Sequence, residues 1–395
     1  MNRFKYYTPD GVSDILPEDC YTKKDLEGKL RQLFLLNGYQ EVETPTLEFY
    51  DVFSAGNSFV PQEEMFKFFD NNGRILVLRY DGTLPVARVI STLMKDEDMP
   101  VLLFYIGNMF RYNETGGGKQ REFTQAGIEI LGPNTPESDA QAIEVAIRSA
   151  LELGISDLQV SLGNVEFFKG LVEEWGLDVD KSLILQKLIE NKEILGIKDF
   201  CKSTSLPENA NELLDKMLYS AGGLELIDEM FSLINNEKAR AALDNLKRVM
   251  CILKDCGMDK YISFDLGMLQ SLNYYTGVIF KGFTYGLGFP IFSGGRYDKV
   301  ADQFGRPANA TGFSLGINMV MKALRRKGLV SKGAGPQLLV GYDSSSKDAQ
   351  RKAFDYAQGQ RAKGVKVMTD CAGLNEEGIK GLAESKGIGE YKFFA

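Results

Sequence analysis

The sequence predicts an α+β fold: an antiparallel sheet flanked by helices, with a helical insertion and a small C-terminal α/β domain. Strand-like segments in the first 170 residues are separated mainly by turns, which favours antiparallel pairing. A charged, leucine-rich stretch with helical spacing covers residues 171–261, and strand-like sequence returns after it. The segment 336–395 begins with an apolar strand followed by an amphipathic helix.

The first 170 residues show both helical and strand periodicity. Apolar residues at positions 26, 30, 33 and 34 predict a helix that the pair Asn37-Gly38 ends. Pro136 and Ser138 predict the start of a second helix, which runs to about residue 153. We expect strands at residues 39–42, 75–78, 101–106, 123–130 and 158–162.

The helical insertion is predicted at residues 171–261. Apolar residues at 213, 214, 217 and 218, and again at 224, 227 and 231, follow the period of a helix face. Strand character at residues 274–283 and 289–292 indicates that the sheet begun before the insertion is completed after it. Cys251 and Cys256 are the nearest pair of cysteines, and the apolar spacing around them favours core positions over a metal site.

The C-terminal part of the chain predicts a separate domain. Residues 326–335 are rich in Gly, Lys and Ser, which is typical of a linker. We therefore expect a core domain of residues 1–325, interrupted by the insertion, and a small α/β domain of residues 336–395.

Composition excludes several classes of function. The chain has 395 residues, 44% of them hydrophobic, and contains no apolar run of the roughly 18 residues that cross a bilayer. A net charge of -8 argues against an extended basic surface for nucleic acid. The absence of histidine rules out catalysis by imidazole and zinc sites with histidine ligands. Five cysteines and no apolar leader favour the cytoplasm, and we expect no metal and no cofactor.

Two glycine-rich segments are better interpreted as turns than as nucleotide sites. Residues 116–119 fail the spacing of a phosphate-binding loop, and Gln120 replaces the hydroxyl that would bind the metal ion, so we expect a hairpin tip. Gly286 and Gly288 lack the third glycine and the strand-to-helix context of a dinucleotide site.

The segment 104–132 is predicted to form a hairpin whose polar side chains could bind a charged ligand. Arg111 on the outgoing strand and Gln125 and Glu129 on the returning strand are spaced to share one face. A cation opposite an amide and a carboxylate suits a zwitterion or a phosphate. The alternative is an ion-pair ladder on a sheet surface, and spacing alone favours that alternative.

This hairpin resembles motif 2 of the class II aminoacyl-tRNA synthetases, and in detail the histidyl-tRNA synthetases. LRYDGT at residues 78–83 resembles their amino-acid-binding loop, LNYYTG at 272–277 their histidine signature, and SGGRYD at 293–298 the strand turn that follows it. The resemblance covers residues 5–325. It implies a class II synthetase-like fold and a homodimer formed through motif 1, in which Pro45 lies.

The resemblance also implies a pocket for L-histidine. It places Asp81, Thr83 and Gln125 at the ammonium group, and Glu129 and Tyr275 near the imidazole ring. A carboxylate opposite an ammonium group is favourable chemistry. The implied ligand-binding residues are Asp81, Thr83, Arg111, Gln125, Glu129, Tyr274, Tyr275 and Tyr297. The alternative is that the three tyrosines are core aromatics and that Thr83 caps a helix.

The sequence departs from the synthetase pattern where charge matters most. Joining an amino acid to ATP brings two anions together and requires several preorganised cations, which active members supply as three arginines. Arg111 stands at one of these positions, but Gln270 and Met319 stand at the other two. We therefore expect negligible adenylation, although Gln270 can still donate a hydrogen bond to a carboxylate. Residues 336–395 carry nine Lys plus Arg against eight Asp plus Glu, so we expect no tRNA binding.

A histidyl-synthetase-like chain that lacks two catalytic arginines resembles the regulatory subunits of ATP phosphoribosyltransferase. The resemblance implies a non-catalytic protein that the short catalytic subunit requires for activity, in a hetero-octamer of four plus four. It also implies feedback inhibition by L-histidine at the first step of histidine biosynthesis. A chain free of histidine suits that role. The alternatives are an active histidyl-tRNA synthetase and a histidine-binding interaction module of another system.

Overall fold

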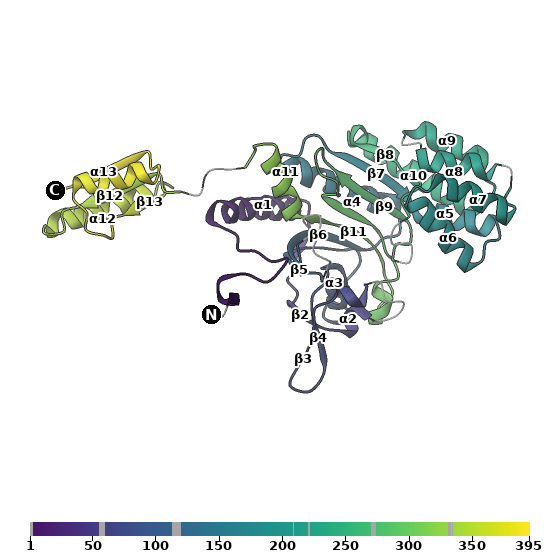
Figure 1. Cartoon of the computed structure of the whole chain (residues 1–395), viewed down its shortest axis with the longest axis horizontal. Coiled ribbons are helices and arrows are strands. Elements are labelled where there is room, and N and C mark those ends of the chain that lie inside the picture. The colour runs from purple at the N-terminus through teal and green to yellow at the C-terminus, as the bar shows by residue number, and fades with distance from the viewer. Residues whose placement is uncertain are drawn as a thin grey trace. The chain divides into compact units, whose positions relative to one another are not determined.

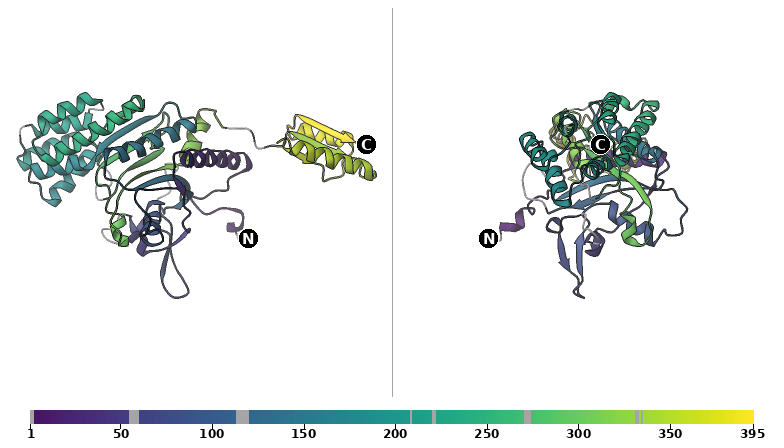
Figure 2. Two further views of the ribbon diagram at one scale, coloured as in Figure 1. Left: turned by 180° about the vertical axis from the view of Figure 1, so that it is seen from behind. Right: turned by 90° about the vertical axis from the view of Figure 1, so that its right-hand side faces the viewer.

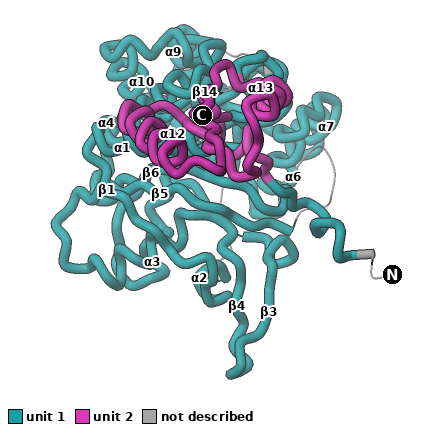
Figure 3. The backbone as a smooth tube through the Cα atoms, turned by 90° about the vertical axis from the view of Figure 1, so that its left-hand side faces the viewer, with its two compact units in different colours: residues 1–14, 23–329 teal, residues 15–22, 330–395 magenta. Residues whose placement is uncertain are grey.

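A computed structural model describes residues 3–54, 60–112, 120–207, 209–219, 222–269, 274–330, 333 and 335–395. The chain forms two compact units, shown in different colours in Figure 3. The first unit consists of Met1–Asp14 and Lys23–Leu329, and the second of Ile15–Thr22 and Val330–Ala395. None of the helices in the described ranges is long and apolar enough to cross a lipid bilayer.

An eight-stranded sheet forms the centre of the first unit, in the order β1-β5-β6-β11-β10-β9-β7-β8. Its inner pairs are antiparallel, whereas β1 with β5 and β7 with β8 are parallel. The pairing of β7 with β8 and β9 confirms that the sheet is completed after the helical stretch. The strands are β1 (Gln40–Glu41), β5 (Val101–Phe110), β6 (Glu122–Gly132), β7 (Gln159–Asn164), β8 (Ile262–Phe264), β9 (Val278–Phe283), β10 (Phe292–Arg296) and β11 (Asn309–Gly316).

The strand predicted at residues 289–292 is wrong in position. The observed strand β10 begins at Phe292 and continues to Arg296. Pro290 has no N–H to donate to a ladder, and the backbone N–H of Ile291 donates to the Gly282 carbonyl just before regular pairing begins. The aromatic residues at 289 and 292 were therefore a poorer guide than the glycines and arginine that follow them.

Helices α1 and α4 cover one face of this sheet. Phe34 of α1 is fully buried against Phe104 and Phe313, with ring centroids 5.4 and 6.3 Å apart, and these two rings lie on neighbouring register positions of β5 and β11. Helix α4 packs on β10 and β11. Gly38 adopts φ +83° just after α1, as the Asn37-Gly38 signal predicts. The helices around the sheet are α1 (Pro17–Leu36), α2 (Asp51–Ser54), α3 (Thr83–Thr92), α4 (Pro136–Glu152) and α11 (Ile317–Arg326).

A small antiparallel sheet in the order β2-β4-β3 packs with α2 and α3 in the core that covers part of the other face. Its strands are β2 (Leu47–Phe49), β3 (Lys67–Phe69) and β4 (Ile75–Leu78). Register pairs Phe49 with Leu76 and Leu76 with Phe68, so these side chains share one face with Leu47. Leu47, Phe49 and Phe68 are exposed, which leaves an apolar sheet face open in the single chain.

Helices fill the chain between β7 and β8 and gather beside the β7–β8 edge of the sheet (Figures 1 and 2). Side chains of Asn164, Asp178 and Asn236 accept N–H groups in the first turns of three of them, which explains where those helices begin. Cys251 and Cys256 are exposed, so their predicted core positions are wrong. The buried apolar residues of the helix 237–255 lie on a neighbouring stripe. These helices are α5 (Val165–Glu174), α6 (Val179–Glu190), α7 (Ile194–Thr204), α8 (Ala210–Tyr219), α9 (Leu224–Leu233) and α10 (Glu237–Asp255).

The second unit contains a parallel sheet in the order β13-β12-β14 with one helix on each face. Ala353 of α12 packs against Val340, and Ile379 of α13 packs against Leu339, its neighbour on the strand. Adjacent strand residues point to opposite faces, which is why the two helices form separate small cores. The elements are β12 (Leu338–Tyr342), α12 (Lys347–Arg361), β13 (Val367–Thr369), α13 (Glu376–Ser385) and β14 (Glu390–Phe394).

The contact of α1 with the central sheet yields a stability prediction. Phe34→Ala should lower the free energy of unfolding by about 3–5 kcal/mol, because it removes a fully buried ring and leaves a cavity. Leu36→Ala, an exposed position on the same helix, is the control and should change it by less than about 0.5 kcal/mol. Urea unfolding followed by circular dichroism measures both, and equal effects would contradict this packing.

Candidate functional site

The carboxyl group of Glu129 lies over glycines on the face of the central sheet opposite α1 and α4. Register pairs Glu129 of β6 with Gly312 of β11, and Gly312 with Gly295 of β10. A Cβ atom at Gly312 would collide with the Glu129 carboxylate and with the Ile128 carbonyl. These glycines therefore leave the space that the carboxyl group occupies. We call this surface the site face.

Glu129 is 2% exposed and is held by two hydroxyl groups. Thr83 Oγ1 donates to its Oε1 at 2.8 Å, and the Tyr297 hydroxyl donates to its Oε2. Burial raises the pKa of Glu129 to about 8, while these two hydroxyls act to lower it and the neighbouring Asp81 acts to raise it. The group is thus poised to ionise when a cation or a ring N–H approaches it.

Two buried polar atoms on the site face have no hydrogen-bond partner within the described ranges. They are Oε1 of Gln125, which is 8% exposed, and the hydroxyl of Tyr105, which is 5% exposed. Gln125 lies on β6 in line with Glu129, and Tyr105 pairs in register with the residue between them. Leaving such groups unsatisfied is costly, and an ammonium group has three N–H donors to offer.

Tyr105 is a site residue that sequence reasoning missed. Cβ atoms at Gly82 or Gly127 would collide with its ring or its hydroxyl, so both glycines allow its close approach. A signal was available, because Tyr105 stands at an even spacing from Arg111 on a predicted strand and must share its face.

Asp81 and Thr83 come from the turn that opens α3. The backbone N–H of Leu84 donates to Asp81 Oδ1 at 3.1 Å, so Asp81, and not Thr83, accepts an N–H group of the first turn of α3. The N-cap position itself is Gly82. Burial raises the pKa of Asp81, and the backbone hydrogen bond and the charge of Arg111 oppose that rise. The hydroxyl of Thr83 is directed to Glu129 instead.

Three tyrosines form an aromatic wall. The rings of Tyr274 and Tyr275 meet edge to face with centroids 4.9 Å apart, and Tyr274 stacks on Tyr297 at 5.7 Å. Burial raises the pKa of all three phenols, which keeps them neutral. They also belong to the core, as the alternative interpretation holds, since Tyr297 is buried in the cluster that packs around α3.

Arg111, Gln270 and Met319 stand at the three positions that carry arginine in the synthetase pattern. The guanidinium of Arg111 lies 4.3 Å from the Tyr80 ring centroid and 5.1 Å from that of Phe123, and its Nε donates to the Tyr80 carbonyl at 3.2 Å. Met319 lies half-buried in the first turn of α11 and offers only a neutral thioether. Gln270 lies outside the described residues.

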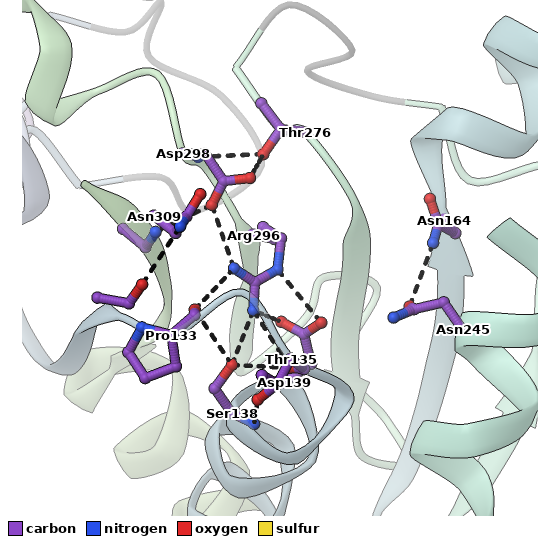
Figure 4. Close-up of polar contacts among 12 residues, drawn as sticks. Pro133, Thr135, Ser138, Asp139, Asn164, Asn245, Thr276, Arg296, Asp298 and Asn309 are labelled. Atoms are coloured by element: carbon purple, nitrogen blue, oxygen red, sulfur yellow. Dashed lines mark hydrogen bonds and ion pairs between the residues drawn. The ribbon is translucent and has the colours of Figure 1, made fainter. Parts of the chain in front are cut away.

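Behind the aromatic wall, Arg296 forms a buried polar network (Figure 4). Arg296 is 4% exposed, and its Nη2 lies 2.9 Å from Asp139 Oδ1 and its Nη1 3.1 Å from Asp298 Oδ1. Asp298 Oδ2 in turn accepts the Thr276 hydroxyl at 2.8 Å. Since these residues adjoin Tyr297 and Tyr275 in the chain, the network holds both from the opposite face of β10.

The structure thus brings the predicted residues to one place. Hydrogen bonds join Thr83, Glu129 and Tyr297, and ring contacts add Tyr274 and Tyr275. Strand register puts Gln125 and Arg111 on the same face. In the described part of the hairpin these residues form no ion-pair ladder, and hydroxyl groups bind Glu129 instead. The described residues include no group of three or more Cys, Asp or Glu side chains that could hold a metal ion.

Comparison with known proteins identifies close relatives. The family profile described as Histidyl-tRNA synthetase matches residues 11–320. An ATP phosphoribosyltransferase regulatory subunit of Acetivibrio thermocellus is 48% identical over 98% of this chain and 92% of its own length. A regulatory subunit of the same description from Ruminiclostridium cellulolyticum is 43% identical, with the same coverage.

Solved structures agree with these sequence matches. An ATP phosphoribosyltransferase regulatory subunit/histidyl-tRNA synthetase of Bacillus halodurans superimposes with a TM-score of 0.88 at 30% identity, covering 100% of this chain and 99% of that one. A histidyl-tRNA synthetase of Nostoc superimposes with a TM-score of 0.83 at 21% identity, covering 97% and 90%, and shows that the fold is shared.

The raised pKa of Glu129 yields a pH prediction for the ligand-free protein. The folded state holds this proton up to about pH 8, whereas the unfolded chain releases it near pH 4.5. The wild type should therefore lose roughly 2–5 kcal/mol of stability, relative to Glu129→Gln, as pH rises from 5 to 8.5. Chemical unfolding of both proteins at the two pH values measures this, and a pH-independent difference would contradict a protonated Glu129.

Proposed function

The chain belongs to the ATP phosphoribosyltransferase regulatory subunits, a family built on the histidyl-tRNA synthetase fold, and we propose that its site binds L-histidine without activating it. Its role is that of a regulatory subunit in histidine biosynthesis. The proposal concerns how the site serves that role: it senses histidine, the end product, and passes the signal to the short catalytic subunit.

The observation that carries the proposal is the pair of unsatisfied buried atoms that share the site face with Glu129. Gln125 Oε1 and the Asp81 carboxylate would accept the ammonium group of histidine, with the Tyr105 hydroxyl adjacent. Glu129 would accept an imidazole N–H, with Tyr275 forming the aromatic wall beside the ring. An imidazole suits a carboxyl group that ionises near neutral pH, because either partner can carry the proton.

Adenylation is absent in this proposal because the site lacks charge. In the synthetase pattern three arginines neutralise the carboxylate and the phosphates, and here only Arg111 stands at its position. Removing one preorganised donor typically raises a reaction barrier by about 3–4 kcal/mol, and two cations are replaced, by Gln270 and Met319. The second unit, a reduced form of an anticodon-binding domain with nearly balanced charge, supports the absence of tRNA binding.

The assembly we propose is a homodimer that joins the short catalytic subunit in a hetero-octamer of four plus four. The open apolar face of the small sheet, formed by Leu47, Phe49 and Phe68, supports the dimer, since Pro45 of motif 1 directly precedes it in the chain. Exposed thiols such as Cys20 and Cys371 suit the reducing cytoplasm in which such an enzyme would work.

Feedback inhibition requires histidine to bind one conformation of the complex better than another. A coupling of about 1–3 kcal/mol is typical of such systems and corresponds to an affinity ratio of roughly 5–150. The network of Arg296 and Asp298 supports this role, because it ties the aromatic wall to α4 on the opposite face of the sheet.

Substitution at the ammonium end tests the binding site. Asp81→Ala and Gln125→Ala should each weaken L-histidine binding by roughly 10–100-fold, because each removes an acceptor of a charged N–H group. Asp96→Ala and Gln62→Ala, which alter exposed positions, are the matched controls. Isothermal titration calorimetry measures all four. Unchanged affinity in the first pair would place the effector site elsewhere.

Reconstitution tests the regulatory role. Adding this chain to the short catalytic subunit should raise the rate of phosphoribosyl transfer to ATP, and L-histidine should then inhibit the complex. Asp81→Ala should still activate the catalytic subunit but should require at least about tenfold more histidine for inhibition. If the complex with Asp81→Ala is as sensitive to histidine as the wild-type complex, inhibition does not depend on this pocket.

A further inference from the structure

A cavity of about 150 Å³ lies in the first unit at the junction of the central sheet and the helices α6 and α8. Its walls come from β7, β9, the end of α6, α8 and the segment that follows β8. The space exceeds the roughly 30 Å³ share of one water molecule several times, so it can hold a small organic ligand. None of the eight predicted site residues lines it.

Charged groups of both signs line this cavity. Glu190 ends α6, Asp265 follows β8 directly, Lys281 lies on β9 and Lys192 lies two residues beyond α6. Burial lowers the pKa of Lys281, and the charges of Asp265 and Glu190 oppose that change, so both carboxylates lie close enough to act on the Lys281 ammonium group. Ser161, the register partner of Lys281, adds a hydroxyl.

The two carboxylates retain acceptor capacity. Glu190 Oε1 accepts the side-chain amide of Gln186 at 2.8 Å, and Asp265 Oδ1 accepts the backbone N–H of Gly267 at 3.1 Å. Within the described ranges neither carboxylate forms an ion pair with a lysine or arginine. The rest of the lining is mainly apolar and comes from Ile189, Met217, Leu218, Met268, Leu269 and Phe283.

Lys192 occupies a backbone conformation that normally favours glycine. It follows the cap of α6 with φ 56°, in the left-handed region, where a long side chain is uncommon. Glycine at this point would avoid that conformational cost. The side chain of this lysine lines the cavity.

We propose that this cavity binds a second ligand, an α-amino acid in its zwitterionic form with an apolar side chain. The ammonium group would lie between Glu190 and Asp265, the carboxylate at Lys281 and Lys192, and the side chain against the apolar lining. Charges of both signs beside an apolar surface match this class of molecule, whereas a simple anion or cation would leave one pair of charges unused.

The cavity shares a face of the central sheet with the site of Glu129. Lys281 pairs in register with Ser293 of β10, and Ser293 leads through Ser314 to Gly127 of β6, two residues from Glu129. A ligand in the cavity would therefore lie on the site face.

Calorimetry on the full-length protein tests the inference with L-leucine, L-methionine, L-phenylalanine and L-histidine as probes. At least one of these probes should bind Glu129→Gln as tightly as it binds the wild type. The same probe should bind Lys281→Met about tenfold more weakly or worse. Lys187→Met, an exposed lysine on α6, is the control and should bind as the wild type does. If no probe binds Glu129→Gln, or if Lys281→Met leaves affinity unchanged, the second site is refuted. If only the histidine site fails, no histidine will bind at Glu129, whereas the probe will still bind in the cavity lined by Lys281.

A variant that cannot fail by unfolding completes the test. Lys192→Gly should keep or raise the melting temperature, because glycine suits the left-handed conformation, yet it should weaken the same probe several-fold. Ser205→Gly is the matched control: it has φ 52° at the end of α7, does not line the cavity, and should leave binding unchanged. Equal affinity in both variants would overturn the role of Lys192.

Discussion

The site depends on placing the carboxyl group of Glu129 on the sheet face with no ion-pair partner among the residues that the structure describes. Glycines at facing positions of β10 and β11 make room for it, and hydroxyls of Thr83 and Tyr297 satisfy its oxygens. Burial of a carboxyl group in this way favours its neutral form until a ligand supplies a positive charge or an N–H donor that stabilises the carboxylate. The turn before α3, the aromatic wall and the network of Arg296 all serve to hold these groups in place.

The same fold can keep ligand binding and lose chemistry because the two have different electrostatic requirements. Binding an amino acid requires acceptors for an ammonium group and a shaped pocket. In the site we propose, Asp81 from the turn before α3 and Gln125 and Glu129 from strand β6 supply these. Forming an adenylate requires concentrated positive charge around two anions. A family of regulatory subunits on the synthetase fold is what this division predicts, and the relatives of this chain carry that description.

Most of the fold could be predicted from the sequence. The hydrophobic periodicity and the turn residues within each segment were sufficient to predict β4, β5, β6, β7 and α4. Prediction failed where tertiary context decides. Pro290 displaced a strand expected from its aromatic neighbours, and the exposed Cys251 lies beside the apolar stripe of α10 and not within it. For the site, the eight residues came from resemblance, while the unsatisfied hydroxyl of Tyr105 and the network of Arg296 required the register of distant strands.

We propose that the pocket has kept its acceptors and lacks two of the three arginines of the synthetase pattern. The most direct measurement is histidine-dependent exchange of pyrophosphate into ATP, performed on protein that binds L-histidine. We expect exchange indistinguishable from a reaction without histidine. Exchange at the rate of an ordinary aminoacyl-tRNA synthetase would contradict the proposal, because Arg111 would then suffice for chemistry that takes three arginines in the synthetase pattern.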